Sequence, residues 1–138
     1  MSISSEAVSD QGNGGYNADS WKDIVLPVGM LIYAGYSDRP DFGRYFTDRE
    51  TVLANADGQF SFVIWGVLQV RPHTTKGDRQ MIRELRVAQE CPCAAGSATA
   101  NAGAYWGGGG GYQFFIPDRM HGNLRETRII PLNTTGLL

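Results

Sequence analysis

The sequence lacks the features by which membrane, exported and nucleic-acid-binding proteins are usually recognised. No run approaches the roughly 18 apolar residues of a membrane span, and residues 1–20 are too polar for a signal peptide. Only 19% of the residues are charged, against about 25% in typical soluble domains, and the net charge of −2 comes with scattered basic residues. We therefore expect a protein made in the cytoplasm, with no nucleic-acid or membrane partner, whose surface is partly covered by other proteins.

Cysteine and histidine are scarce, with two residues of each. Cys91 and Cys93 are two positions apart, so a disulfide between them would be strained and would close almost no loop. A metal site would need both cysteines together with His73 and His121, and that spacing matches no standard zinc finger. We expect free thiols, no metal and no cofactor.

No familiar catalytic signature is present. The glycines at 107–111 fall one short of a G-x-G-x-x-G pattern, and no Gly-Lys-Ser/Thr follows them. A cysteine nucleophile would need a positioned base, and neither histidine lies in a recognisable family signature. The aspartates lie mostly in expected turns, where carboxylates accept local backbone hydrogen bonds. The sequence therefore favours a protein that is not an enzyme and has no catalytic residues.

Short apolar and aromatic segments separated by turn residues indicate a mainly β fold. A chain of 138 residues is long enough for one ordinary domain. The most apolar segment, 59–70, follows an Asp57-Gly58 turn signal and is predicted to be the central strand. The other expected strands are 28–34, 44–48, 112–116 and 127–132.

The segment 79–90 is ambiguous between helix and strand. As a helix it would begin at Asp78 and gather Met81, Ile82 and Leu85 on one side; as a strand it would alternate Leu85 inward with Glu84 outward. The local pattern slightly favours the helix, and both alternatives stay open from the residues alone.

The two ends of the chain differ from its middle in composition. Residues 1–22 are rich in Ser, Gly, Asn and Asp and show no periodicity, so we expect an extended N-terminal arm that attaches to a partner. Residues 23–138 form the single β-rich domain. The 18 glycines are about twice the usual share. Many fall in the last third of the chain, which predicts glycine-rich C-terminal loops.

Aromatic residues stand beside glycine at several places, most densely in "YWGGGGGYQFF" at 105–115. A glycine run without side chains lets another backbone approach closely, and aromatic residues are enriched in protein interfaces. A sugar-stacking platform is the alternative use of the same residues. We predict an assembly or ligand contact formed by Tyr16, Tyr105, Trp106, Gly109 and Tyr112.

Three segments, "LPVGMLIYAGYS", "FGRYFTD" and "DGQFSFVIWGVLQV", resemble small phage head decoration (capsid cement) proteins, with Gly29, Tyr45, Gly66 and Val70 as the best matches. The resemblance implies a small β-barrel or β-tulip-like domain and a strand at "RELRV". It also implies a homotrimer that binds the major capsid protein and stabilises the shell. On this reading the chain is a non-enzymatic component of the bacteriophage virion.

A second resemblance competes with the first. "GGGGGYQFFIPDRMHGNLR" is similar to a segment of phage tail collar and tail-fibre domains, and "LPVGMLIYAG" is similar to the segment that opens them. This alternative implies a tail module that recognises a host surface glycan through Tyr105, Trp106 and Tyr112. Both resemblances place the protein on a virion.

Overall fold

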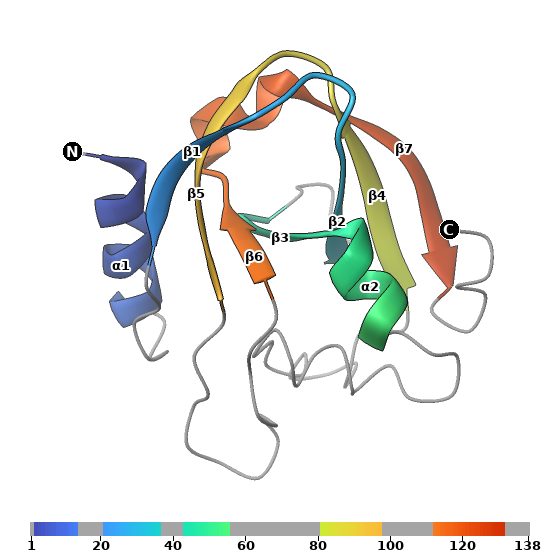
Figure 1. Cartoon of the computed structure of the whole chain (residues 1–138), viewed down its shortest axis with the longest axis horizontal. Helices are drawn as coiled ribbons and strands as arrows, with labels where there is room; N and C mark the ends of the chain where they lie inside the picture. Colours follow the sequence, from blue (N-terminus) through green and yellow to red (C-terminus); the bar gives the residue numbers. More distant parts are fainter. Residues whose placement is uncertain (1, 14–20, 37–42, 56–80, 98–111, 132–138) are drawn as a thin grey trace, which may run out of the picture.

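The computed structural model describes residues 2–13, 21–36, 43–55, 81–97 and 112–131 (Figure 1). Its helical elements are α1 (Ile3–Asn13), α2 (Arg49–Asn55) and the 3-10 helix η1 (Asp118–Asn123). Its strands are β1 (Lys22–Leu26), β2 (Leu31–Tyr36), β3 (Tyr45–Asp48), β4 (Met81–Val87), β5 (Cys91–Ser97), β6 (Tyr112–Phe115) and β7 (Leu124–Pro131). None of these helices in the described ranges is long and apolar enough to cross a membrane.

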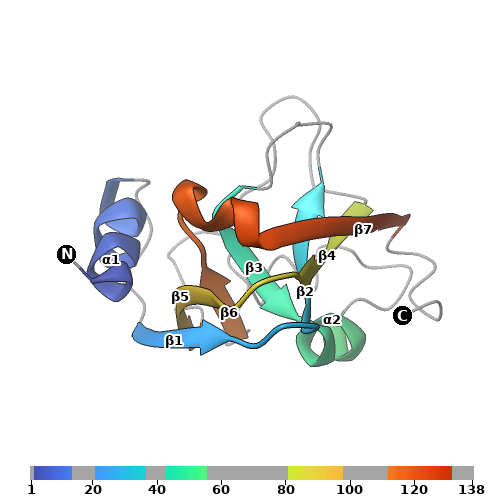
Figure 2. The same cartoon turned by 90° about the horizontal axis from the view of Figure 1, so that it is seen from above.

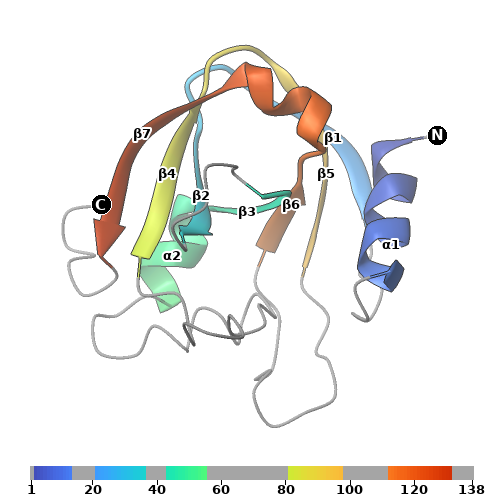
Figure 3. The same ribbon diagram turned by 180° about the vertical axis from the view of Figure 1, so that it is seen from behind.

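The seven strands form one antiparallel sheet in the order β1-β5-β6-β3-β2-β4-β7. The sheet curls into an arch whose limbs are β1 with β5 and β4 with β7, joined through β6, β3 and β2 (Figures 1 and 3). The expectation of a mainly β domain is confirmed. The sheet is curved as in a barrel but is not closed, because β1 and β7 remain its two edges.

Alternation along the strands divides the sheet into two faces. Successive side chains of a strand point to opposite faces, and directly paired residues share a face. The first face carries the main hydrophobic core. Its buried members are Leu26, Ile32, Ala34, Phe46, Leu85, Val87, Cys91, Cys93, Ala95, Phe114, Ile116 and Leu124.

A tight turn links β1 to β2, which lie far apart in the sheet. β1 ends before Pro27, which cannot donate to a strand ladder. The Met30 amide donates to the Pro27 carbonyl, and Gly29 between them has a φ of 92° that favours glycine. The Gly29 amide donates to the Val87 carbonyl, so the turn is also joined to the end of β4.

All four predicted strands that lie in the described residues are present. β2, β3, β6 and β7 correspond to the expected strands, with shifted ends. The ambiguous segment is the strand β4, as the family resemblance implied, because pairing on both sides with β2 and β7 outweighs its helical pattern. The expected central strand at 59–70 lies outside the described residues.

The helix α2 was not expected. Its signal was Asp48, the last residue of β3, whose carboxylate accepts a hydrogen bond from the Thr51 amide at 2.8 Å. This is a helix N-cap, and Glu50 in the first turn adds a favourable charge next to the helix dipole. The buried Val52 anchors the helix, which contacts β2 and β3.

The extended arm expected at 1–22 is wrong for Ile3–Asn13, which form α1. The Ser2 hydroxyl accepts a hydrogen bond from the Ser5 amide, and the Asp23 carboxylate accepts one from the Ser4 amide, so two amides of the first turn are capped. α1 lies at one side of the sheet, beside β1 and β5 (Figure 2). The division of the chain at residue 22 into an arm and a single domain stays a prediction.

Candidate functional site

A row of polar residues crosses the second face of the sheet. Strand register aligns Gln113 with Thr47, Thr47 with Tyr33, Tyr33 with Glu84, and Glu84 with Arg128. These five residues, here called the polar row, come from five adjacent strands, β6, β3, β2, β4 and β7. Gly96 of β5 pairs with Gln113 and continues the row without a side chain. Directly paired residues of antiparallel strands have Cβ atoms about 5 Å apart, so the row is continuous.

Four members of the row, all except Arg128, are buried. Tyr33 is 0% exposed, Thr47 1%, and Glu84 and Gln113 5% each. A buried polar group without a hydrogen bond costs roughly 1–3 kcal/mol, so each member of a buried polar row needs a hydrogen-bond partner, a requirement that an apolar row would not have. Buried polar clusters of this kind are frequently functional sites.

Glu84 is the best-connected member of the row. Its Oε2 accepts a hydrogen bond from the Tyr33 hydroxyl at 2.9 Å, and its Oε1 accepts one from Thr127 Oγ1 at 2.6 Å. The Arg128 guanidinium adds a two-pronged contact, Nε to Oε1 at 3.1 Å and Nη2 to Oε2 at 3.2 Å. Both carboxylate oxygens are therefore satisfied, and the group is fixed in one orientation.

A β-bulge in β7 makes this arrangement possible. Glu84 pairs with Arg128 and Leu85 pairs with Glu126, so Thr127 is an extra residue on β7. The extra residue allows two successive side chains, those of Thr127 and Arg128, to reach the same carboxylate. Bulges often lie beside functional sites, where they redirect a side chain.

The pKa values show which groups of the row stay fixed in charge. Burial raises the pKa of the Glu84 carboxyl, but hydrogen bonds from Arg128, Thr127 and Tyr33 outweigh it and leave the pKa below its ordinary value. Burial, together with the bond to Glu84, raises the pKa of Tyr33. At neutral pH Glu84 is thus an anion and Tyr33 a neutral donor. Glu84 positions its neighbours and is not tuned to exchange protons near pH 7.

The opposite end of the row is uncharged. The Thr47 hydroxyl donates to the Tyr112 carbonyl at 2.6 Å, which ties β3 to the first residue of β6. The Gln113 carboxamide lies next along the row and can both donate and accept hydrogen bonds. The polar row therefore runs from an amide and hydroxyls to a carboxylate and a guanidinium, a series that suits a ligand with several hydroxyl, amide or anionic groups.

An aromatic cluster lies beside the uncharged end. Phe115 and Tyr45, each two residues from a member of the polar row, pair across β6 and β3, with ring centroids 5.5 Å apart. Trp21 lies 6.4 Å from each of these rings. Ala7 of α1 packs on this cluster. The helix α1 is thus adjacent to the strands that carry Thr47 and Gln113.

The residues predicted as a contact surface are mostly not placed. Tyr16, Tyr105, Trp106 and Gly109 lie outside the described residues. Tyr112, at the start of β6, is 40% exposed, and its ring packs edge-on against Phe114 at 5.2 Å. Its role as a contact residue stays a prediction.

Both cysteines are free and buried in the main core, Cys93 opposite Ile24 and Cys91 opposite Leu26 of β1. Burial raises the pKa of the Cys91 thiol, and burial with the nearby Cys91 and Asp23 raises that of Cys93 to about 12. The thiols are therefore poor nucleophiles. Among the described residues, no three His, Cys, Asp or Glu side chains are grouped as a metal site would need.

Comparison with known proteins decides the family. The model of the Rhs1 C-terminal toxin domain matches residues 1–118. The chain belongs to the Rhs1 C-terminal toxin domain family. No curated protein matches the chain.

Solved structures of similar fold agree with this family. Rhs1-CT, solved in complex with its cognate immunity protein RhsI1, is 27% identical with a TM-score of 0.81 over 95% of this chain and 96% of that one. Tne2 in complex with Tni2 is 16% identical with a TM-score of 0.57, over 84% of this chain and 97% of that one. Tse6 in complex with Tsi6 is 13% identical with a TM-score of 0.53, over 91% and 94%. The last two show similarity of fold alone.

These findings overturn the virion interpretation. The resemblance to phage head decoration proteins is wrong, and so is the one to tail collar and tail-fibre domains, because the family model covers residues 1–118. The expected partners are therefore wrong as well, namely a major capsid protein, a homotrimer on the shell and a host glycan. The expected virion location is also wrong. Both resemblances depended on short apolar strands and turns, which are common to many small β domains. These features therefore predicted the fold class but could not identify the function.

The sequence-based reasoning also missed the members of the polar row. In the strand alternative Glu84 was expected to point outward, but that side is the second face of the sheet, and Glu84 is buried there. The available signal was a polar residue within an apolar strand, as with Glu84 in "MIRELRV" and Gln113 in "YQFF". Strand order, which the sequence does not display, is what aligns the five residues.

Proposed function

We propose that this chain is the toxic domain of a toxin–immunity pair and is neutralised by direct binding of a cognate immunity protein. The observation that carries the proposal is the match to the Rhs1 C-terminal toxin domain. The similarity to Rhs1-CT, which extends over 95% of this chain, supports it, because that domain is solved bound to its immunity protein. The toxin would act inside a cell that lacks the immunity protein.

The polar row is the part of the described structure best suited to the toxic action. It places hydrogen-bonding groups from five strands in one line, with an orientation fixed by the contacts of Glu84. Such pre-positioned polar groups are what binding and catalysis of a small polar ligand require.

The action we propose is catalytic, in place of the non-enzymatic role expected from the sequence. That expectation depended on the absence of familiar motifs, and motifs identify only the families that carry them. A toxin that turns over a ligand needs few copies per cell, whereas one that only sequesters its target needs about as many copies as there are targets. Gln113 and Thr47 would contact the ligand, and Glu84 would hold the side chains of Tyr33 and Arg128 in position.

Expression in a bacterial cell tests the proposed function. The wild-type chain under a tightly repressed promoter is expected to stop growth on induction, and a genomic library from the producing strain is expected to contain a gene whose product restores growth. That product should form a stable one-to-one complex with the purified chain. Normal growth with folded chain accumulating in the cell would contradict a toxic function.

Dose dependence separates catalysis from sequestration. In a growth-arrest assay with graded induction, a catalytic toxin stops growth at copy numbers far below those of any abundant metabolite. Metabolites extracted from arrested cells should then show one small polar compound depleted and its product accumulated. If arrest requires copy numbers comparable with those of the depleted compound, the catalytic proposal is wrong while the toxin proposal stands.

A further inference from the structure

The helix α1 is attached to the domain mainly by polar contacts. Only Ala7 of its described side chains is fully buried, and Val8 on its surface is 44% exposed. A helix of 11 residues with so small an apolar face gains little from burial and is marginal in isolation. Ile3 and Ala7 pack against the aromatic cluster, and the charged and hydroxyl side chains of α1 add the polar contacts that hold it in place.

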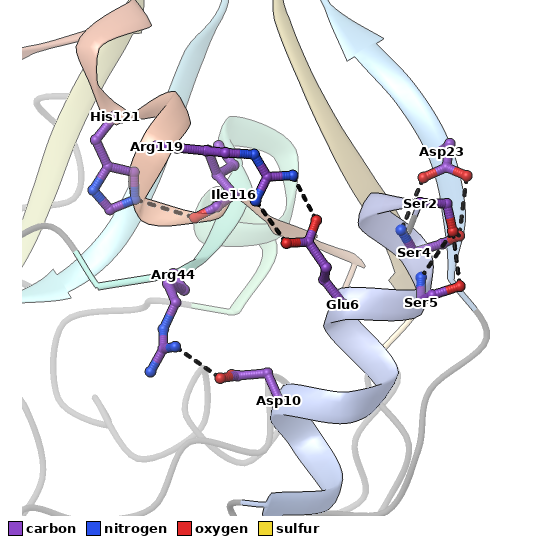
Figure 4. Close-up of polar contacts among 10 residues, drawn as sticks. All are labelled: Ser2, Ser4, Ser5, Glu6, Asp10, Asp23, Arg44, Ile116, Arg119 and His121. Carbon is purple, nitrogen blue, oxygen red and sulfur yellow. Dashed lines mark hydrogen bonds and ion pairs between the residues drawn. The ribbon is translucent and has the colours of Figure 1, made fainter.

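Three such contacts reach η1, the residue before β3, and β1 (Figure 4). Glu6 accepts a two-pronged contact from Arg119 of η1, with both N–O distances at 2.6 Å. Asp10, one turn further along, pairs with Arg44 at 2.8 Å. At the start of the helix, Ser4 donates to Asp23 of β1 through its amide at 2.8 Å and its hydroxyl at 3.0 Å.

The Asp10 contact leads directly to the polar row. Asp10 also accepts a hydrogen bond from the Tyr45 hydroxyl, so α1 binds the first residue of β3. The Arg44 carbonyl accepts a hydrogen bond from the Ile116 amide, which joins this end of β3 to the end of β6. Thr47 lies two residues after Tyr45 in β3, and its partner Gln113 lies three residues before Ile116 in β6.

The contacts of α1 are accessible to salt. The Arg119 and Arg44 side chains are 51% and 49% exposed, and their partners Glu6 and Asp10 are 26% and 22% exposed. Ion pairs of this exposure are weakened by dissolved salt, because the Debye length falls to about 3 Å at 1 M. The ion pairs that join α1 to Arg119 and Arg44 are therefore the contacts through which its attachment can be changed without disturbing the main core.

We propose that α1 is a releasable strap that holds the β3–β6 pair, and with it Thr47 and Gln113, in working position. Glu6 and Asp10 are positioning residues that act through Arg119 and through Arg44 with Tyr45. Release of α1 uncovers the aromatic cluster of Trp21, Tyr45 and Phe115 and loosens the uncharged end of the polar row. The link to toxicity rests on the proposed function; the strap itself does not.

Hydrogen exchange of the full chain tests the strap directly. In the double variant Glu6→Gln/Asp10→Asn at low salt, the amides of Ile3–Asn13, β3 and β6 should exchange about tenfold faster than in the wild type, while those of β4 and β7 are unchanged. The control Glu50→Gln removes an exposed carboxylate from the first turn of the other helix, α2, and should change none of these rates. Equal exchange rates in α1, β3 and β6 in all samples would overturn the proposal.

Charge exchange and toxicity complete the test. The pair Glu6→Arg/Arg119→Glu should restore protection of β3 and β6 that either single change removes, because the ion pair is re-formed with reversed signs. The double variant Glu6→Gln/Asp10→Asn should need about tenfold more expression to stop growth. Faster exchange with full toxicity would overturn control of the row by α1. A non-toxic wild-type chain would instead contradict the proposed function and leave the exchange test intact.

Discussion

Tyr33 and Glu84 face each other across β2 and β4, and the Tyr33 hydroxyl donates a 2.9 Å hydrogen bond to Glu84 Oε2. Neither side chain belongs to the main hydrophobic core on the first face. The pair joins the uncharged end of the polar row to its charged end, and two measurable consequences follow from it.

Tyr33→Phe removes one donor from a buried carboxylate and leaves the packing of the ring unchanged. We expect the free energy of unfolding to fall by about 1–2 kcal/mol, the usual cost of leaving a buried acceptor with one bond fewer. Urea denaturation measures the change. A variant as stable as the wild type would show that the Tyr33–Glu84 bond contributes nothing to the fold.

The pH dependence of stability reports on Glu84. Its pKa in the folded chain is lower than its ordinary value of 4.5, so the unfolded chain binds the proton more readily. The contribution of Glu84 is then fully present above about pH 4.5 and is lost as the pH falls through the lowered pKa. Between these two pH values, wild-type stability should fall more steeply than that of Glu84→Gln. Parallel curves for the two proteins would be inconsistent with a lowered pKa.

Gly29→Ala tests the turn between β1 and β2. The φ of 92° at Gly29 is unfavourable for any residue with a Cβ, although no atom within 4 Å would collide with it. We expect a loss of about 1–2 kcal/mol in thermal or urea unfolding, which is the cost of the left-handed conformation itself. Gly122→Ala is the matched control, because an added Cβ also meets open space there but the φ is not in that region. Equal effects of the two changes would exclude backbone strain as the cause.

The two thiols should be protected from alkylation in the folded chain. Cys91 and Cys93 are fully buried, and burial raises both pKa values, that of Cys93 to about 12. Iodoacetamide at pH 8 should therefore label neither residue until denaturant is added, as read by mass spectrometry. Rapid labelling of either thiol in the native chain would contradict its place in the core.

The sequence predicted the strands better than the helices, for physical reasons. Strands such as β3 and β6 carry aromatic and branched residues between turn signals, and these local features survive in the fold. α1 has almost no apolar face, and it is held by Arg119 and Arg44, which lie far away in the sequence. No periodicity within residues 1–22 could display those contacts.

The candidate site could not be predicted, because it exists only through strand order. Gln113 and Thr47 are 66 positions apart in the chain and become neighbours when β6 pairs with β3. The bulge at Thr127, which directs two side chains to Glu84, likewise depends on the register of β7 against β4. Function was misassigned for a related reason: short β segments with glycine turns occur in many unrelated proteins.

The most direct test of the polar row as the site of toxicity is a growth assay of Gln113→Met beside Val8→Ser. Gln113→Met keeps the side-chain volume and removes every hydrogen bond of the amide, whereas Val8→Ser changes an exposed residue of α1. Thr47→Val serves as a second variant of the row, and circular dichroism confirms that each chain is folded. We predict that folded Gln113→Met or Thr47→Val permits growth at induction levels where Val8→Ser and the wild type stop it. Full toxicity of both folded row variants would contradict the account.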